Sequence, residues 1–241
     1  NKMAITKNGM EEQAENKTGL ITWIEKNKKI VIGLVVALIV IVGGYFAYKY
    51  LYIAPREEKA EAAIFKGETY FGIGAYNEAL NGDNRGYIGF LRVIKEYGGT
   101  KTAKLANGYA GICYAQLGKY KEALEYLGQF DGDDAIVAPM VMAAQGDCYE
   151  ELGDLDKASA AFLDAAEMAD SKAAGTEGVN NSISPLFLMK AALVYEKQNN
   201  YGKALELYTE IKETYVNSTQ ARSGEIDKYI ERAELLSGQN K

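Results

Sequence analysis

A long apolar run near the N-terminus dominates the hydropathy pattern. Nineteen residues from Ile30 to Tyr48 carry no charge, and lysines lie on both sides of them. As a helix rising about 1.5 Å per residue, the run would extend roughly 28 Å, which is close to the thickness of a bilayer core. Trp23 and the tyrosines that follow Gly44 stand where interfacial aromatic residues are common. The pattern therefore predicts a single transmembrane anchor helix over residues 23–54, in contact with lipid through residues 30–48.

Two other structures are compatible with this run, a cleaved signal peptide and a buried core helix. A secretory apolar region is usually about 7 to 15 residues long and ends in small residues, whereas this run is longer and ends in bulky ones. These features favour an uncleaved anchor. Basic residues near the two ends differ by one in favour of the N-terminal side, which predicts a cytoplasmic N-terminus. Residues 1–22 are polar and are predicted to form a flexible cytoplasmic tail, and Pro55 is expected to break the membrane helix.

Beyond the apolar run, one pattern of small and aromatic residues recurs four times. Each copy has a Gly or Ala, a Tyr three residues later, a Gly or Asn four residues after that, and then an aromatic residue or Leu followed by an Ala. Repetition of this kind is typical of stacked helical repeats. The copies are Gly67, Tyr70, Gly74, Tyr76, Ala79; Gly111, Tyr114, Gly118, Tyr120, Ala123; Gly146, Tyr149, Gly153, Leu155, Ala158; and Ala192, Tyr195, Asn199, Tyr201, Ala204.

Each position has a mechanical role in a helical hairpin. The first small residue lets two helices approach closely, and the Gly or Asn takes the left-handed conformation that ends the first helix. The alanine keeps the second helix near the first. These residues resemble the tetratricopeptide repeat (TPR) signature over residues 58–215. The predicted fold is all-α: a TPR solenoid of about four hairpins over residues 55–218 (about 60–97, 103–130, 139–169 and 185–215), a C-terminal capping helix and tail over 219–241, and one preceding transmembrane helix.

Some segments are expected to depart from a regular solenoid. Residues 81–86 should interrupt the second helix of the first hairpin, and residues 175–182 should lengthen the third connection. Pro185 is expected to begin a helix behind an N-cap at Ser184. An amphipathic helix from about Thr219 to Leu236 is predicted to cover the core of the last hairpin.

The composition excludes several kinds of chemistry. The 241-residue chain has no histidine and two cysteines, which removes the usual general base and argues against a structural zinc site. Its net charge of −6, without a basic stripe, argues against nucleic-acid binding. No phosphate-binding loop or nucleophile elbow occurs, and the acidic segment 131–134 is expected to cap a helix. We therefore predict no enzyme activity, catalytic residue, cofactor, metal or small-molecule substrate.

The two cysteines occupy equivalent positions, each directly before the Tyr of its repeat. Cys113 and Cys148 are expected to be packing residues, and a disulfide is the alternative. Equivalent positions on stacked repeats lie about 10 Å apart, whereas a disulfide needs Cα atoms within about 7 Å. The spacing therefore favours two free, half-buried thiols.

A concave surface is the expected binding site. In TPR proteins the ligand-facing residues lie on the first helix of each hairpin, and the matching positions here predict an apolar groove with an acidic patch. Such a groove suits extended or helical peptides with hydrophobic and basic residues. The alternative is that its apolar members belong to the core between repeats and that the acids only solvate a face. The candidate groove residues are Phe71, Ile112, Gln116, Met140, Asp147, Glu150, Glu151, Met189, Leu193 and Glu196.

The whole arrangement resembles the YfgM-like ancillary subunits of the bacterial Sec translocon. The resemblance rests on the order of short tail, anchor, spacer and acidic TPR domain, and on the segment from Trp23 to Lys29 before the apolar run. It implies an inner-membrane protein with a periplasmic TPR domain, whose partners would be SecYEG and a membrane-anchored periplasmic chaperone. The alternative is a scaffold subunit of another cell-envelope complex, for outer-membrane biogenesis, division or motility.

Overall fold

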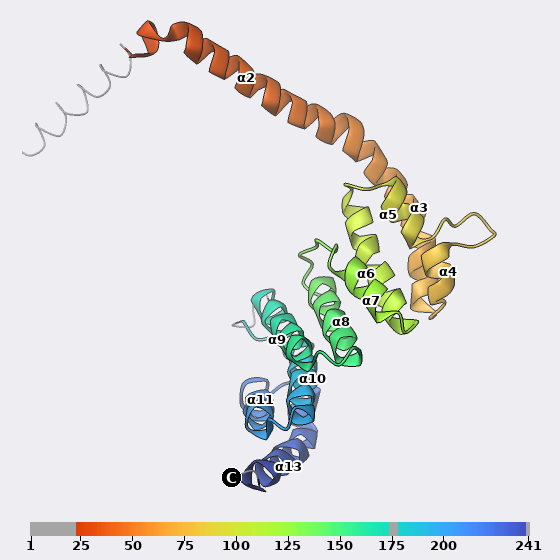
Figure 1. Cartoon of the computed structure of the whole chain (residues 1–241), viewed down its shortest axis with the longest axis vertical. Coiled ribbons are helices and arrows are strands. Elements are labelled where there is room, and N and C mark those ends of the chain that lie inside the picture. The colour runs from red at the N-terminus through yellow and green to blue at the C-terminus, as the bar shows by residue number, and fades with distance from the viewer. Residues whose placement is uncertain (1–22, 174–177, 240–241) are drawn as a thin grey trace, which may run out of the picture. The chain divides into compact units, whose positions relative to one another are not determined.

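The computed structural model describes residues 23–173 and 178–239, and all regular structure in these residues is helical (Figure 1). The predicted all-α class is therefore confirmed. The chain divides into two compact units, residues 1–55 and residues 56–241. The predicted tail over residues 1–22 lies outside the described residues, as do residues 174–177 of the third connection and the last two residues of the chain.

The first unit contains the apolar helix. Helix α2 spans Lys28–Ala47 and is followed directly by the π-helical turn η1, Tyr48–Ile53. No residue of α2 is buried, although most of them are apolar, and by length and composition this is the one helix among the described residues that could cross a membrane. Pro55 is the second residue of α3, so the predicted break at Pro55 is wrong. Proline lacks an N–H donor, so it cannot make the backbone hydrogen bond of a regular helix. The helix does not end there but widens just before Pro55, in the turn η1, where Ala54 N–H bonds to the Lys49 carbonyl.

In the described residues, the second unit is a series of four helical hairpins followed by a short helix and a longer final helix (Figure 1). Each hairpin has a long first helix, and each helix from the second helix of the first hairpin onward contacts the next helix along the chain. The first hairpin has its second helix in two pieces. The hairpins are α3 Ala54–Gly72 with α4 Tyr76–Asn81 and α5 Phe90–Glu96; α6 Lys101–Gln116 with α7 Tyr120–Leu127; α8 Val137–Glu151 with α9 Leu155–Ser171; and α10 Ser184–Lys197 with α11 Tyr201–Thr214.

Four residues in the left-handed region end the four first helices, as the repeated pattern predicts. They are Gly74 (φ 76°), Gly118 (φ 73°), Gly153 (φ 81°) and Asn199 (φ 58°). In each case the next residue donates its N–H to the carbonyl of the repeat's tyrosine, for example Lys119 to Tyr114 at 2.9 Å. This bond satisfies a carbonyl that the end of the helix would leave unpaired, and it turns the chain into the second helix.

The small residues of the pattern allow the two helices of a hairpin to meet. A Cβ atom placed on Gly111 would lie 2.5 Å from Leu127 Cγ, and one on Gly146 would lie 2.7 Å from Phe162 Cε1. Ala192 is fully buried at the same position of the fourth hairpin. The alanines of the second helices, Ala79, Ala123, Ala158 and Ala204, are fully buried as well.

The insertion in the first hairpin is organised around one carboxylate. Asp83 Oδ1 accepts the backbone N–H groups of Arg85 (2.8 Å) and Tyr87 (2.9 Å), while Asp83 Oδ2 accepts the Tyr70 hydroxyl at 2.5 Å and pairs with Lys66 at 2.6 Å. The Tyr87 hydroxyl then donates to the Ala79 carbonyl at 2.9 Å. The inserted loop is therefore held against α3 and α4.

Two local predictions near the C-terminus need correction. The predicted helix over 219–236 is two helices, α12 Thr219–Arg222 and α13 Glu225–Gln239, because Gly224 between them has φ 70°. Ser184 is the first residue of α10 rather than its N-cap. Its buried hydroxyl donates to Asp170 Oδ1 on α9 at 2.6 Å. The Ser184 hydroxyl is therefore bonded to a carboxylate of the preceding helix and does not cap α10.

The final helix α13 covers the core of the fourth hairpin, as predicted. Ile226 and Ala233 are fully buried, and the Tyr229 ring lies 5.2 Å from that of Tyr208 on α11. The acidic segment before α8 also behaves as expected, because Asp134 Oδ1 accepts the backbone N–H groups of Ile136 and Val137.

Candidate functional site

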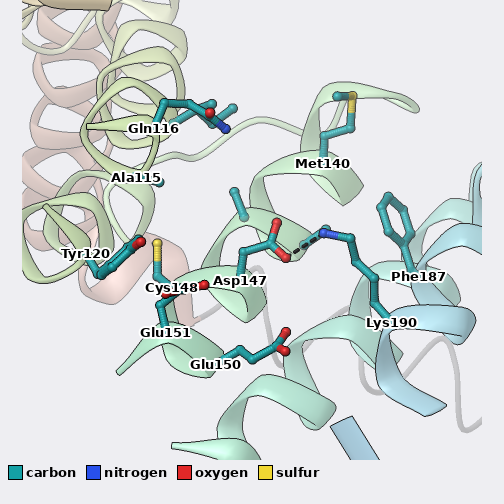
Figure 2. A pocket seen from close by; sticks show the side chains of 13 residues that line it. Ala115, Gln116, Tyr120, Met140, Asp147, Cys148, Glu150, Glu151, Phe187 and Lys190 are labelled. Atoms are coloured by element: carbon teal, nitrogen blue, oxygen red, sulfur yellow. Dashed lines mark hydrogen bonds and ion pairs between the residues drawn. The ribbon is translucent and has the colours of Figure 1, made fainter. Parts of the chain in front are cut away.

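Two hollows on the second unit are lined mainly by the first helices of its hairpins. The first, which we call the apolar hollow, has a volume of about 550 Å³. It lies between α6, the start of α7, α8 and α10 (Figure 2). Its lining residues are Ile112, Ala115, Gln116, Tyr120, Met140, Ala143, Ala144, Asp147, Cys148, Glu150, Glu151, Phe187 and Lys190.

The second, which we call the ionic hollow, has a volume of about 560 Å³ and shares three residues with the first. The shared residues are Asp147, Glu150 and Lys190, so the two hollows adjoin and together form what we call the groove. The other lining residues of the ionic hollow are Leu193, Glu196, Lys197, Tyr201, Arg232 and Leu236.

Helical periodicity explains why these side chains share a surface. On α8 the lining residues Met140, Ala144, Asp147 and Glu151 follow one another at intervals of three or four, and such residues stand on one face of a helix. Residues 190, 193 and 197 on α10 do the same. The groove is therefore a consequence of stacking first helices side by side.

The structure places eight of the ten predicted groove residues in these hollows. Phe71 and Met189 are the exceptions. The Phe71 ring is half-buried, with its centroid 5.0 Å from that of Tyr109, and Met189 packs against the core of the last two hairpins. Both belong to the core between helices, in line with the alternative interpretation for the apolar positions. The apolar hollow is lined by the predicted residues Ile112, Gln116, Met140, Asp147, Glu150 and Glu151, and the ionic hollow by Leu193 and Glu196.

Three of the four acids in the predicted acidic patch, all but Glu151, take part in ion pairs among the described residues. Lys190 pairs with Asp147 (dashed line in Figure 2), with 2.5 Å between Nζ and Oδ1, and Lys197 pairs with Glu150. Each lysine on α10 therefore neutralises an acid on α8. These pairs are partly exposed to solvent, so each contributes little to stability, and both partners are accessible to a ligand.

The third ion pair joins α10 to the final helix. Arg232 Nη2 contacts both carboxylate oxygens of Glu196, at 2.8 and 2.7 Å. The buried Tyr208 donates its hydroxyl to Glu196 Oε1 at 3.1 Å. Burial of Tyr208 and the negative Glu196 beside it raise the pKa of that tyrosine. The pKa of Arg232 is also raised, because its charged form is hydrogen-bonded to Glu196.

Sequence reasoning missed the three basic residues of the groove. Lys190 occupies the same repeat position as Phe65, Tyr109 and Ala144, so the repeat register could have pointed to it. Arg232 comes from outside the repeats, and no repeat pattern could have placed it opposite Glu196.

The remaining polar groups of the groove show no sign of activated chemistry. The Cys148 thiol is buried, and this burial, together with Asp147 and Glu151, raises its pKa to about 11. Both Cys148 and Cys113 are free, which agrees with the predicted packing role, but they are fully buried and not half-buried as expected. Across residues 23–173 and 178–239, no group of three or more His, Cys, Asp or Glu side chains is arranged to hold a metal ion. The arrangement offers apolar contacts, hydrogen bonds and exchangeable ion pairs.

Two segments of the chain match known protein families whose fold agrees with this architecture. Residues 141–172 match a family of tetratricopeptide repeats, and so do residues 187–218. This chain contains tetratricopeptide repeats. The two matched TPR segments fall on α8–α9 and on α10–α11 with the residues that follow, and they supply most of the groove's charged side chains. A comparison with curated proteins found no match.

The first two hairpins lie outside the matched segments, yet they are built in the same way. Each has the small residue, the left-handed glycine and the buried alanine in the same order. The first is also interrupted by the loop after Asn81. TPR repeats indicate a scaffold for protein–protein interaction, and the groove of this chain offers both apolar and charged side chains.

Proposed function

We propose that this chain is a membrane-anchored, non-catalytic TPR scaffold that holds a segment of a partner protein in the groove. The observation that carries the proposal is the continuity of the two hollows, because a single extended or helical segment can place an apolar side chain in one and charged side chains in the other. TPR repeats themselves indicate a scaffold for protein–protein interaction.

The apolar hollow suits a hydrophobic side chain. Met140 is 51% exposed and stands beside Ile112 and Phe187, so a ligand side chain placed there would remove apolar surface from water. The ionic hollow suits a segment with charges of both signs. A ligand carboxylate can share Lys190 or Lys197, while a ligand amine can approach Glu151, which takes part in no ion pair among the described residues.

The anchor and the cellular location are parts of the same proposal. The length and composition of α2, together with its lack of buried residues, support insertion in a bilayer through residues 30–48. We place the protein in a bacterial inner membrane with a cytoplasmic N-terminus and a periplasmic TPR domain. SecYEG and a membrane-anchored periplasmic chaperone are the proposed partners, on the basis of the similar arrangement of tail, anchor and TPR domain. A scaffold of another envelope complex is the second candidate.

Affinity purification of the full-length protein in mild detergent, with mass spectrometry of the retained proteins, tests the partner. Recovery of SecY, SecE or SecG is the expected result. Recovery of another envelope complex without these subunits would replace the translocon assignment.

A pair of variants tests the groove. Met140→Glu puts a charge in the apolar hollow and should reduce retention of the partner about tenfold. Leu186→Glu is the control, because Leu186 is 46% exposed on α10 and does not line the groove. Equal retention by both variants, with loss on deletion of residues 24–55, would show that the partner docks on the membrane helix instead.

A further inference from the structure

The outer face of α3 lacks a neighbour that the first helix of every later hairpin has. The aligned positions Gly67, Gly111, Gly146 and Ala192 set the register of the four hairpins. In this register two positions of α3 can be followed through the solenoid. Ala62 aligns with Ala106, Val141 and Phe187, and Thr69 aligns with Cys113, Cys148 and Val194.

Exposure at these positions changes abruptly between the first hairpin and the others. The three residues that align with Ala62 are 0%, 2% and 7% exposed, and the three that align with Thr69 are fully buried. Ala62 and Thr69 themselves are exposed. On the same side of α3, Phe65 is 71% exposed and Ile73 is 74% exposed. This face, made by Ala62, Phe65, Thr69 and Ile73, is called the α3 face below.

In the later hairpins a helix of the preceding hairpin covers the positions equivalent to Ala62 and Thr69. Val141 and Cys148 share a core cluster with Ala123 and Leu127 of α7. Phe187 and Val194 share one with Ala158 and Phe162 of α9. Both covering helices present an alanine with a large apolar residue four positions later, which places the two side chains one turn apart on one face. The α3 face therefore has the form of a surface that an amphipathic helix covers.

Charge around the α3 face indicates what kind of helix fits. Glu58 and Glu61 are exposed, and neither is in an ion pair among the described residues. Lys66 at the edge is already paired with Asp83, and Lys59 is the remaining exposed cation. The unpaired charge beside the face is thus negative, and a covering helix with basic residues along its apolar stripe gains favourable contacts.

We propose that the α3 face is a second docking site, separate from the groove, which binds an amphipathic helix of a partner protein that carries an alanine, a large apolar residue four positions later, and flanking lysines or arginines. The helix would extend the solenoid by acting as the second helix of a missing preceding hairpin. The groove, which is lined mainly by α6, α8, α10 and α13 and not by α3, can remain occupied at the same time.

Two synthetic helical peptides provide a direct test. Both carry the same Ala and Leu stripe at i and i+4, and they differ only in having Lys or Glu at the flanking positions. Binding of each fluorescently labelled peptide is measured by anisotropy to the full-length protein in nanodiscs of zwitterionic lipid, with empty nanodiscs as background. We expect the Lys peptide to bind at least about tenfold more tightly than the Glu peptide.

Variants of the chain locate the binding. Phe65→Glu should abolish binding of the Lys peptide, and Glu58→Lys with Glu61→Lys should reverse the preference between the peptides. Thr69→Arg tests the same face if Phe65→Glu fails to fold, as judged by thermal melting. Glu213→Lys, at an exposed position on α11, should leave the binding unchanged.

Several results would overturn the proposal. Equal binding of both peptides would remove the charge argument, and unchanged binding by Phe65→Glu would place the site elsewhere. If sedimentation shows a dimer of the wild-type protein that Phe65→Glu dissociates, the occupant of the α3 face is a second copy of this chain and not a partner helix.

Discussion

At the scale of single residues, the absence of one methyl group decides how closely α8 and α9 pack. A Cβ on Gly146 would lie 2.7 Å from Phe162 Cε1, and Phe162 is fully buried, so its ring cannot move away at low cost. Gly146→Ala should therefore lower the free energy of unfolding by about 1–3 kcal/mol through overpacking.

Gly202→Ala is the matched control for this substitution. Gly202 is a helical glycine in α11 with no atom within 4 Å of an added Cβ. The methyl group there meets no neighbour and improves helix propensity, so stability should rise by a few tenths to about 1 kcal/mol. Urea denaturation of the purified protein in detergent measures both changes. If Gly146→Ala instead raises the free energy of unfolding, α8 and α9 can move apart without losing stability, which would contradict the overpacking argument.

The residues of the repeat pattern were predictable because each follows from a local requirement. A left-handed backbone favours Gly or Asn, and a close helix approach favours Gly or Ala, whatever surrounds them. The ion pairs were not predictable in the same way. Long side chains such as Lys197 and Arg232 can reach several partners, and only the stacking of α8, α10 and α13 brings Glu150 and Glu196 within their range.

At the scale of elements, the inserted loop of the first hairpin depends on Asp83. The hydrogen bond from the Lys66 ammonium, together with that from the Tyr70 hydroxyl, holds the pKa of Asp83 well below its usual range. Because the pKa of Asp83 is lower in the folded state than in the unfolded state, its ionised carboxylate stabilises the folded protein above about pH 3.9. This stabilisation is lost as the pH falls toward the pKa of Asp83 in the folded state. Asp83→Asn should therefore destabilise the protein most near neutral pH.

The pH dependence separates this effect from a general loss of stability. The difference in urea midpoint between wild type and Asp83→Asn should shrink as the pH is lowered from 7 to 3. Asp164→Asn, at an exposed position of α9, should leave the midpoint unchanged at each pH. A constant difference for Asp83→Asn across this range would contradict the assigned role of the carboxylate.

Sequence patterns located most elements but not every boundary. The interruption after Asn81 was predictable, because the Gly-rich and Asn-rich segment cannot continue a helix with good propensity. The break at Gly224 was missed, because an isolated glycine is tolerated inside many helices and only its φ of 70° separates α12 from α13. The sequence predicts an N-cap at Ser184 because it does not show that Asp170 on the preceding helix accepts the hydroxyl of this serine.

At the scale of the whole molecule, the chain combines a helix that has no buried residues with a solenoid whose core is made of three clusters. Two core clusters follow the first and second halves of the solenoid, and a smaller one lies between them around Val141 and Cys148. The solenoid was predictable because its period repeats in the sequence. The partners in the groove's ion pairs and the exposure of the α3 face were not predictable, because both depend on which helices lie next to each other.

Charged residues in α2 test whether this helix spans a bilayer. Val36→Arg with Ile39→Arg would place two cations near the centre of the apolar run, at a cost of about 2.5–3.5 kcal/mol each in a membrane. Val216→Arg with Leu235→Arg adds the same charge to the second unit, at positions of similar exposure. After carbonate extraction of cells, the wild type and the second variant should remain in the membrane pellet, while the first should shift to the supernatant.

The outcome for the wild type alone also separates the two remaining interpretations of α2. An anchor keeps its apolar run, so peptides from residues 30–48 should be found by mass spectrometry in the pelleted protein. A cleaved signal peptide would leave a protein that begins after this run and extracts into the supernatant. That result would remove the anchor from the proposed function, whereas the groove and the α3 face, which belong to the second unit, would still be available to bind partners.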